Sequence, residues 1–95
     1  MKGLSALMMQ ALEGLKIDTL NPMQESAIEA WREGSDLILL SPTGSGKTLA
    51  YLLPLLETLK PDVQGVQAVV LVPSRELALQ IGQVFRSMNT PFRLM

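Results

Sequence analysis

Apolar residues recur at steps of three and four in three stretches of the chain, and each stretch predicts an amphipathic helix. The stretches cover residues 4–15, 22–34 and 74–88. Asn21 and Pro22 mark the start of the second helix, because asparagine is a favoured N-cap and proline suits the first helical position. We therefore expect three helices that each bury one face, joined by polar connections.

Two shorter runs, residues 37–40 and 68–72, are apolar at every position. Runs of this length are typical of strands covered on both faces in a parallel sheet. A helical pattern follows each run, over residues 47–59 and 74–88, and residues 92–95 look like the start of another strand. This alternation predicts an α/β fold, a parallel sheet with flanking helices. Two or three strands are few for such a sheet, so we expect the chain to be part of a longer domain.

The segment between the first apolar run and its helix has the pattern of a phosphate-binding loop. It reads Ser41, Pro42, Thr43, Gly44, Ser45, Gly46, Lys47 and Thr48. Glycines let the backbone turn so that successive N–H groups point at one spot, and the following helix adds its unpaired N-terminal donors. We predict that all eight residues contact a nucleoside triphosphate. The alternative is an ordinary turn with a chance lysine, and Ser41 stands where the pattern usually has glycine.

Two residues of this loop are the candidate catalytic residues. Lys47 is expected to bind the β- and γ-phosphates, and Thr48 is expected to offer its hydroxyl to Mg²⁺.

Gln24 and Arg75 each fit two roles. Gln24 can complete a capping box with Asn21, or its amide can pair with N6 and N7 of adenine. Arg75 follows Ser74 at the start of a predicted helix, where a nucleic-acid phosphate could bind, or Ser74 is an ordinary N-cap beside a solvated arginine. Local chemistry alone favours the capping role at both places.

The composition of the chain excludes several kinds of chemical site. The chain has 95 residues, 47% of them hydrophobic, a net charge of −1, and neither cysteine nor histidine. Disulfides, thiol catalysis, zinc sites and imidazole bases are therefore excluded within these residues. The net charge gives no support for nucleic-acid binding. The longest apolar runs are far short of a membrane span, and the lack of cysteine suits a cytoplasmic protein, so we expect no membrane partner.

The order and spacing of three segments resemble the DEAD-box family of ATP-dependent RNA helicases, within helicase superfamily 2. The segments are a Q-motif-like stretch at 16–24, the P-loop at 41–48, and a second helicase block at 73–80 that begins Pro-Ser-Arg-Glu-Leu-Ala. The second block is the most specific, because superfamily-2 DNA helicases use other sequences there. Four positions depart from the family pattern: Ile17 replaces an aromatic residue, Leu20 a proline, Asn21 a threonine or serine, and Ser74 a threonine.

The resemblance implies a RecA-like P-loop fold, of which residues 1–95 are the N-terminal portion of the first domain. It implies that ATP and Mg²⁺ bind at the P-loop, and that Gln24 reads adenine with Ile17 at the stacking position. It also implies that Pro73, Ser74 and Arg75 contact RNA phosphates. The full-length parent is expected to hydrolyse ATP and unwind short RNA duplexes, whereas this piece, without the family's acidic Asp-Glu-Ala-Asp segment, is expected only to bind nucleotide.

Three alternatives stay open at this stage. They are a fragment of a superfamily-2 DNA helicase, a P-loop kinase of small molecules, and a nucleotide-binding interaction module without chemistry. The oligomeric state leaves no trace in the sequence.

Overall fold

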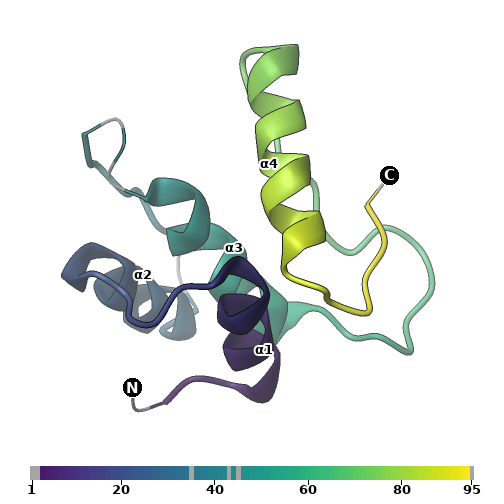
Figure 1. Cartoon of the computed structure of the whole chain (residues 1–95), viewed down its shortest axis with the longest axis horizontal. Helices are drawn as coiled ribbons and strands as arrows, with labels where there is room; N and C mark the ends of the chain where they lie inside the picture. Colours follow the sequence, from purple (N-terminus) through teal and green to yellow (C-terminus); the bar gives the residue numbers. More distant parts are fainter. Residues whose placement is uncertain (1–2, 35, 43, 45, 95) are drawn as a thin grey trace.

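Four helices form the ordered framework of the computed structural model, which describes residues 3–34, 36–42, 44 and 46–94. They are α1 (Ala6–Leu15), α2 (Pro22–Arg32), α3 (Lys47–Thr58) and α4 (Arg75–Ser87). Figure 1 shows α3 in the centre, with α2 on one side, α4 on the other and α1 overlapping the C-terminal end of α3. Within the described part of the chain, no helix has the length and apolar character needed to cross a membrane.

Three of the helices begin at the polar caps that the sequence suggests. Ser5, Asn21 and Ser74 each accept a hydrogen bond from a backbone N–H in the first turn of α1, α2 and α4. Such bonds satisfy donors that the helix itself leaves unpaired. α3 begins differently, after Gly46 in the left-handed conformation (φ 89°), and it has no side-chain cap. Among the helices of the described residues, α3 is thus the one whose start has no side-chain cap hydrogen bond.

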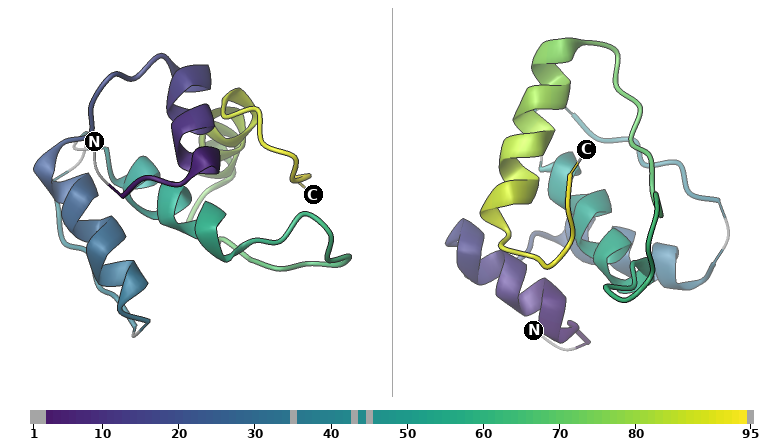
Figure 2. Two further views of the ribbon diagram at one scale, coloured as in Figure 1. Left: turned by 90° about the horizontal axis from the view of Figure 1, so that it is seen from below. Right: turned by 90° about the vertical axis from the view of Figure 1, so that its right-hand side faces the viewer.

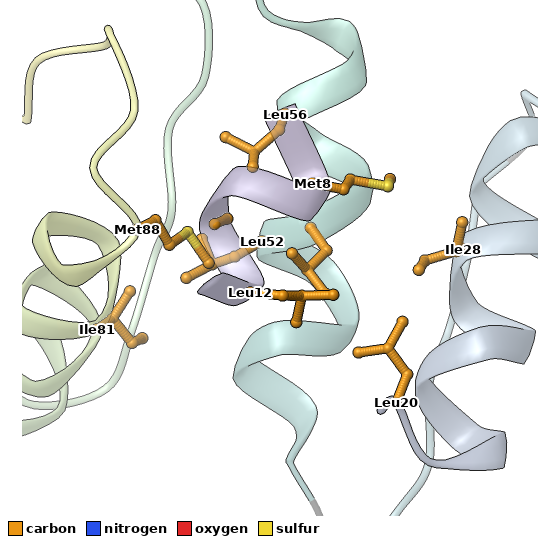
Figure 3. Packing of buried hydrophobic residues seen from close by; sticks show 10 residues of the cluster. Met8, Leu12, Leu20, Ile28, Leu52, Leu56, Ile81 and Met88 are labelled. Carbon is orange, nitrogen blue, oxygen red and sulfur yellow. The ribbon is translucent and has the colours of Figure 1, made fainter. Parts of the chain in front are cut away.

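The hydrophobic core lies where α1 and α3 face each other and is extended by residues from α2 and α4 (Figure 3). Met8, Leu53, Leu56 and Met88 are fully buried. Figure 3 shows side chains from all four helices converging here, with Leu20 from the connection between α1 and α2. The apolar faces predicted from periodicity therefore meet in a single cluster, as burial of apolar area requires.

The predicted parallel sheet is absent from the described residues. Residues 37–40, 68–72 and 92–94 are irregular chain, so the strands predicted there are wrong for this structure. Ile38 and Leu71 are 85% and 90% exposed, although their runs were expected to be covered on both faces. The physical reason is that a strand needs a neighbouring strand to satisfy its backbone N–H and C=O groups. The described residues provide no neighbouring strand for either run.

The second apolar run lies in a long exposed arm between α3 and α4, seen on the right of Figure 1 and again in Figure 2. Gln67 closes the base of the arm: its Oε1 accepts from the Lys60 N–H and its Nε2 donates to the Lys60 carbonyl, both at 2.8 Å. Polar contacts thus close residues 60–67 of the arm, whereas Val72 near its other end packs against the hydrophobic core.

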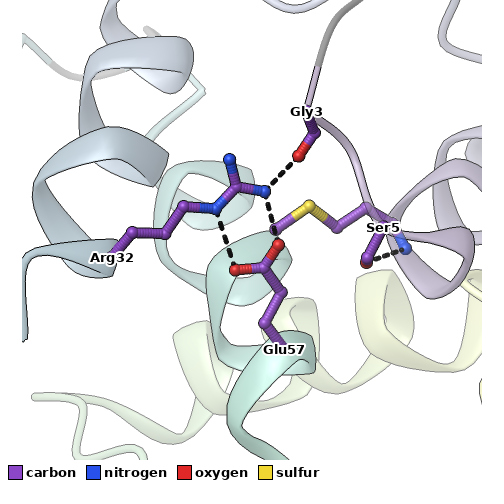
Figure 4. A network of polar contacts seen from close by, with 5 residues as sticks. Gly3, Ser5, Arg32 and Glu57 are labelled. Atoms are coloured by element: carbon purple, nitrogen blue, oxygen red, sulfur yellow. Dashed lines mark hydrogen bonds and ion pairs between the residues drawn. The ribbon is translucent and has the colours of Figure 1, made fainter.

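An ion pair fastens the C-terminal end of α2 to the C-terminal end of α3 (Figure 4). The Arg32 guanidinium donates to both carboxylate oxygens of Glu57, with Nη2–Oε1 at 2.5 Å and Nε–Oε2 at 3.0 Å. The same Nη2 also donates to the Gly3 carbonyl. This bidentate geometry is the strong form of an arginine–carboxylate contact, and it ties the N-terminal segment to the helix pair.

We predict that Glu57→Gln reduces the loss of folding stability that the chain shows as the pH is lowered. The hydrogen bond from Arg32 lowers the pKa of Glu57 below its ordinary value of 4.5, partly opposed by burial. The folded state therefore holds this proton more weakly than the unfolded state, so the stabilisation is present above pH 4.5 and is lost as the pH falls through the lowered value. Urea unfolding followed by Trp31 fluorescence at several pH values measures the effect.

Glu13→Gln is the matched control, because Glu13 is an exposed carboxylate on α1. Glu57→Gln should be less stable than the parent at neutral pH and should lose less stability on acidification than Glu13→Gln. Equal acid sensitivity of the two variants would contradict the role given to the ion pair.

Candidate phosphate-binding site

The predicted phosphate-binding loop joins the irregular residues 36–42 to the start of α3. Gly44 and Gly46 both have positive φ angles, 83° and 89°. Side chains other than glycine rarely adopt this region, so the path of the loop depends on these two residues. Thr43 and Ser45, also predicted to contact nucleotide, lie outside the described residues.

Lys47 is the first residue of α3, and its side chain turns back across the loop. Its Nζ donates to the Ser41 carbonyl at 2.7 Å. The two ends of the predicted motif are therefore in contact, with Pro42 exposed beside them. The lysine ammonium and the uncapped first turn of α3 share one place, which is the combination that attracts an anion to a helix start.

Thr48 is the second residue of α3 and is half-buried. Burial raises the pKa of Tyr51 above 10.0, and a side-chain hydrogen bond with Thr48 opposes that rise. No group of three or more acidic, histidine or cysteine side chains suited to a metal ion occurs among the residues that the structure describes. For Mg²⁺ the described loop offers two hydroxyls, those of Ser41 and Thr48, which is consistent with an ion held mainly by phosphate oxygens and water.

The structure confirms the capping role predicted for Gln24 and shows a second contact of its side chain. Its Oε1 accepts from the Asn21 N–H at 3.0 Å, while its own N–H donates to Asn21 Oδ1 at 2.8 Å, which completes the capping box. Its Nε2 also donates to the carbonyl of Gly46 at 3.1 Å. Gln24 is only 6% exposed and is the one buried polar residue of the described chain. The Q-motif-like segment and the P-loop are therefore joined by a direct hydrogen bond.

This contact requires the absence of a side chain at Gly46. A Cβ built there would lie 2.5 Å from Gln24 Nε2, closer than real Cβ contacts allow. Sequence reasoning singled out both residues but did not predict their contact, because they are 22 positions apart and no periodicity links them.

The remaining predicted site residues lie elsewhere. Ile17 is half-buried and packs against the hydrophobic core. Ser74 is the N-cap of α4, as the capping alternative expected, while Pro73 and Arg75 are exposed beside it. Figures 1 and 2 place the start of α4 away from the P-loop. The structure thus brings together Gln24 and the P-loop residues but not the second helicase block.

Comparison with known proteins identifies the family of the chain. The DEAD/DEAH box helicase family matches residues 21–95, a span that includes Gln24, the P-loop and the start of α4. The chain belongs to the DEAD/DEAH box helicase family. The resemblance found in the sequence is therefore confirmed, and a helicase domain of this family implies a RecA-like fold.

Individual relatives are similar over much of the chain. It is 55% identical to the "Probable ATP-dependent RNA helicase YfmL" of Bacillus subtilis over 65 residues, 68% of this chain and 17% of that protein. It is 49% identical to the "DEAD-box ATP-dependent RNA helicase CshC" of Bacillus cereus over 80 residues, 84% of this chain and 21% of that protein. It is 40% identical to the "Probable ATP-dependent RNA helicase DDX49" of Homo sapiens over 92 residues, 97% of this chain and 19% of that protein. The chain spans about a fifth of the length of these relatives.

We predict that Gly46→Ala destabilises the helicase chain more than Gly44→Ala. Both substitutions force alanine into the left-handed region, which costs about 1–2 kcal/mol. Only the alanine at position 46 also displaces Gln24, because a Cβ at Gly44 would meet nothing within 4 Å. Loss of the hydrogen bond between Gln24 and Gly46 should add about 1 kcal/mol. Urea denaturation of the two variants measures the difference, and equal destabilisation would contradict the contact.

Proposed function

We propose that residues 1–95 form the N-terminal portion of the ATP-binding domain of an ATP-dependent RNA helicase, and that their own task is to bind ATP at the P-loop. The observation that carries this proposal is the meeting of Lys47, two glycines with positive φ, and the uncapped start of α3 at one place. The family match to residues 21–95 supports the same assignment. Hydrolysis of ATP and separation of RNA strands are proposed for the whole protein.

ATP binding uses the groups that the loop leaves exposed to a ligand. Backbone N–H groups at the start of α3 and the positive end of its dipole face the phosphates. Lys47 gives up the Ser41 carbonyl and donates to the β- and γ-phosphates instead. This exchange is favourable because a charge-assisted bond to phosphate is stronger than one to a neutral carbonyl. Ser41, Pro42, Thr43 and Ser45 complete the nucleotide contacts in this proposal.

Mg²⁺ supplies charge neutralisation between the phosphates when it is bound. In this proposal Thr48 holds it, because its hydroxyl is the oxygen donor at the second position of α3.

Adenine is the proposed base, with Gln24 as the residue that reads it. A glutamine oxygen has two lone pairs and its nitrogen has two hydrogens. The capping box uses one lone pair and Gly46 uses one hydrogen, so one acceptor site and one donor remain. These match the N6 amino group and N7 of adenine. Ile17 takes the position beside the base in this proposal.

RNA is the proposed nucleic-acid partner of the whole protein, and the names of the relatives favour RNA over DNA. Pro73, Ser74 and Arg75 are the proposed contacts with the RNA backbone. Arg75 is exposed at the first position of α4, where an arginine and a helix start can both attract phosphate. The same names argue against the small-molecule kinase. Such an enzyme would not need the second helicase block at residues 73–80.

Two further proposals concern the fold of the whole domain and the location of the protein. We propose that in the whole domain the exposed runs 37–40 and 68–72 are strands of one RecA-like parallel sheet, which would cover apolar side chains such as Ile38. The absence of cysteine supports a cytoplasmic location.

We predict that the chain binds fluorescent ADP in the presence of Mg²⁺ and that Lys47→Ala weakens this binding about 10- to 100-fold. That range corresponds to the loss of a charged hydrogen bond worth about 1.5–3 kcal/mol. Gln24→Ala should weaken ADP more than GDP, because guanine lacks the N6 donor. Lys60→Ala, which removes an exposed lysine in the arm, is the control and should leave ADP binding unchanged. A folded chain that binds neither nucleotide would refute the proposed function.

We predict that Arg75→Ala in the whole protein weakens RNA binding by a similar factor for every RNA sequence. Loss of one phosphate contact should also reduce the slope of log affinity against log salt by about 1. Arg86→Ala, an exposed arginine in the last turn of the same helix, is the matched control. Affinity and salt slope that stay at the parental values in Arg75→Ala would return this arginine to a solvated surface role.

A further inference from the structure

The C-terminal end of α4 packs against α1, as Figure 2 shows. Gln10 and Gly14 of α1 are four positions apart, so they lie on the same face of this helix. Gln10 Nε2 donates to the carbonyl of Asn89, just beyond α4, at 2.7 Å. Met88, the C-cap of α4, is fully buried in the hydrophobic core. The end of α4 is therefore held both by a hydrogen bond from α1 and by apolar packing.

Gly14 allows α1 and the end of α4 to approach each other closely. A Cβ built at this position would overlap the Ser87 carbonyl oxygen and would lie 3.2 Å from Asn89 Nδ2. The carbonyl oxygen belongs to the backbone, so it cannot move aside as the end of a flexible side chain can. α1 itself is held by Met8 and Ala11, which are both fully buried. A side chain at position 14 must therefore displace the end of α4.

The start of α4 is less restrained than its end. The buried residues of α4, Ile81 and Gly82, lie at its middle, whereas Arg75 and Glu76 in its first turn are exposed. α4 has 13 residues, so at a rise of about 1.5 Å per residue its start lies about 18 Å from its end. A tilt of about 3° at the anchored end would move the first turn by about 1 Å, because the helix moves as a rod.

We propose that Gln10 and Gly14 are positioning residues for RNA binding, because they set the direction of α4 and with it the place of Arg75. This inference rests on the proposed contact between Arg75 and the RNA backbone. Hydrogen bonds from N–H donors to oxygen span only about 2.7–3.2 Å, so a shift of about 1 Å at the start of α4 weakens the contact with a phosphate. RNA affinity therefore depends on two residues of α1 at the opposite end of α4.

The test measures RNA binding by the whole protein and by its Gly14→Ala, Arg75→Ala and doubly substituted variants. Gly14→Ala should weaken RNA binding about 3- to 10-fold, which is part of the factor that one charge-assisted hydrogen bond provides. Substitutions farther apart than about 10 Å usually have additive effects. We expect instead that Gly14→Ala causes no further weakening in the Arg75→Ala background. ADP affinity should stay unchanged in Gly14→Ala, because the nearest atoms around position 14 belong to residues 87–89.

Gly82→Ala is the matched control. It adds the same methyl group to a helical glycine, but the neighbours of that group are the flexible side chains of Leu94 and Arg86 and not α1. It should leave RNA affinity at the parental value, and a weakening as large as that of Gly14→Ala would overturn the proposal.

Three results for Gly14→Ala would also overturn the proposal. Unchanged RNA affinity would show that the start of α4 does not respond to α1. Equal losses of RNA and ADP binding would indicate general damage to the fold. Losses that add to those of Arg75→Ala would place the effect away from this arginine.

A second variant keeps the test decisive if Gly14→Ala does not fold. Gln10→Met keeps the length of the side chain and removes the donor to the Asn89 carbonyl, and position 10 is exposed, so the core is untouched. A weakening of RNA binding that disappears in the Arg75→Ala background supports the proposal, and any other result overturns it. If Arg75→Ala alone leaves RNA binding unchanged, the proposed RNA contact is refuted, and the positioning role falls with it.

Discussion

The close approach of Gln24 to Gly46 is the contact on which the arrangement of the site depends. It joins the start of α2 to the start of α3 at the point where the loop becomes a helix. It is permitted only because position 46 has no side chain and has a backbone conformation that favours glycine. A glycine in a phosphate-binding loop is usually explained by approach of the phosphate. Here the protein itself uses the space, on the side where Gln24 lies.

The helix pair is held in register at its other end as well. Arg32 near the end of α2 pairs with Glu57 near the end of α3, just as Gln24 and Gly46 meet near the two starts. The two helices therefore run in the same direction, with polar contacts at both ends and apolar side chains such as Ile28 between them. Apolar packing is adaptable in register, whereas directed hydrogen bonds are not. The polar ends thus determine which peptide group of the loop faces Gln24.

The sequence predicted the local features of this chain well and the non-local ones poorly. Helices and their caps at Asn21 and Ser74 follow from residues three or four positions apart, and the structure confirms them. The sheet depends on hydrogen bonds between distant segments, and apolar runs such as 68–72 remain unpaired when the described residues supply no neighbouring strand. The link from Gln24 to Gly46 is also non-local. It could be derived only once α2 and α3 were placed side by side.

The double engagement of Gln24 also bears on the departures from the family pattern. A stacking aromatic residue would hold the base without help, but Ile17 packs toward the core and offers no aromatic face. In the proposed adenine site, recognition of the base falls more heavily on the hydrogen bonds of Gln24, and these are directional only if the amide cannot rotate. The Asn21 N–H and the Gly46 carbonyl prevent that rotation, because exchanging the amide oxygen and nitrogen would set donor against donor and acceptor against acceptor. The bonds that hold the loop therefore also fix which end of the amide donates and which accepts on its free side.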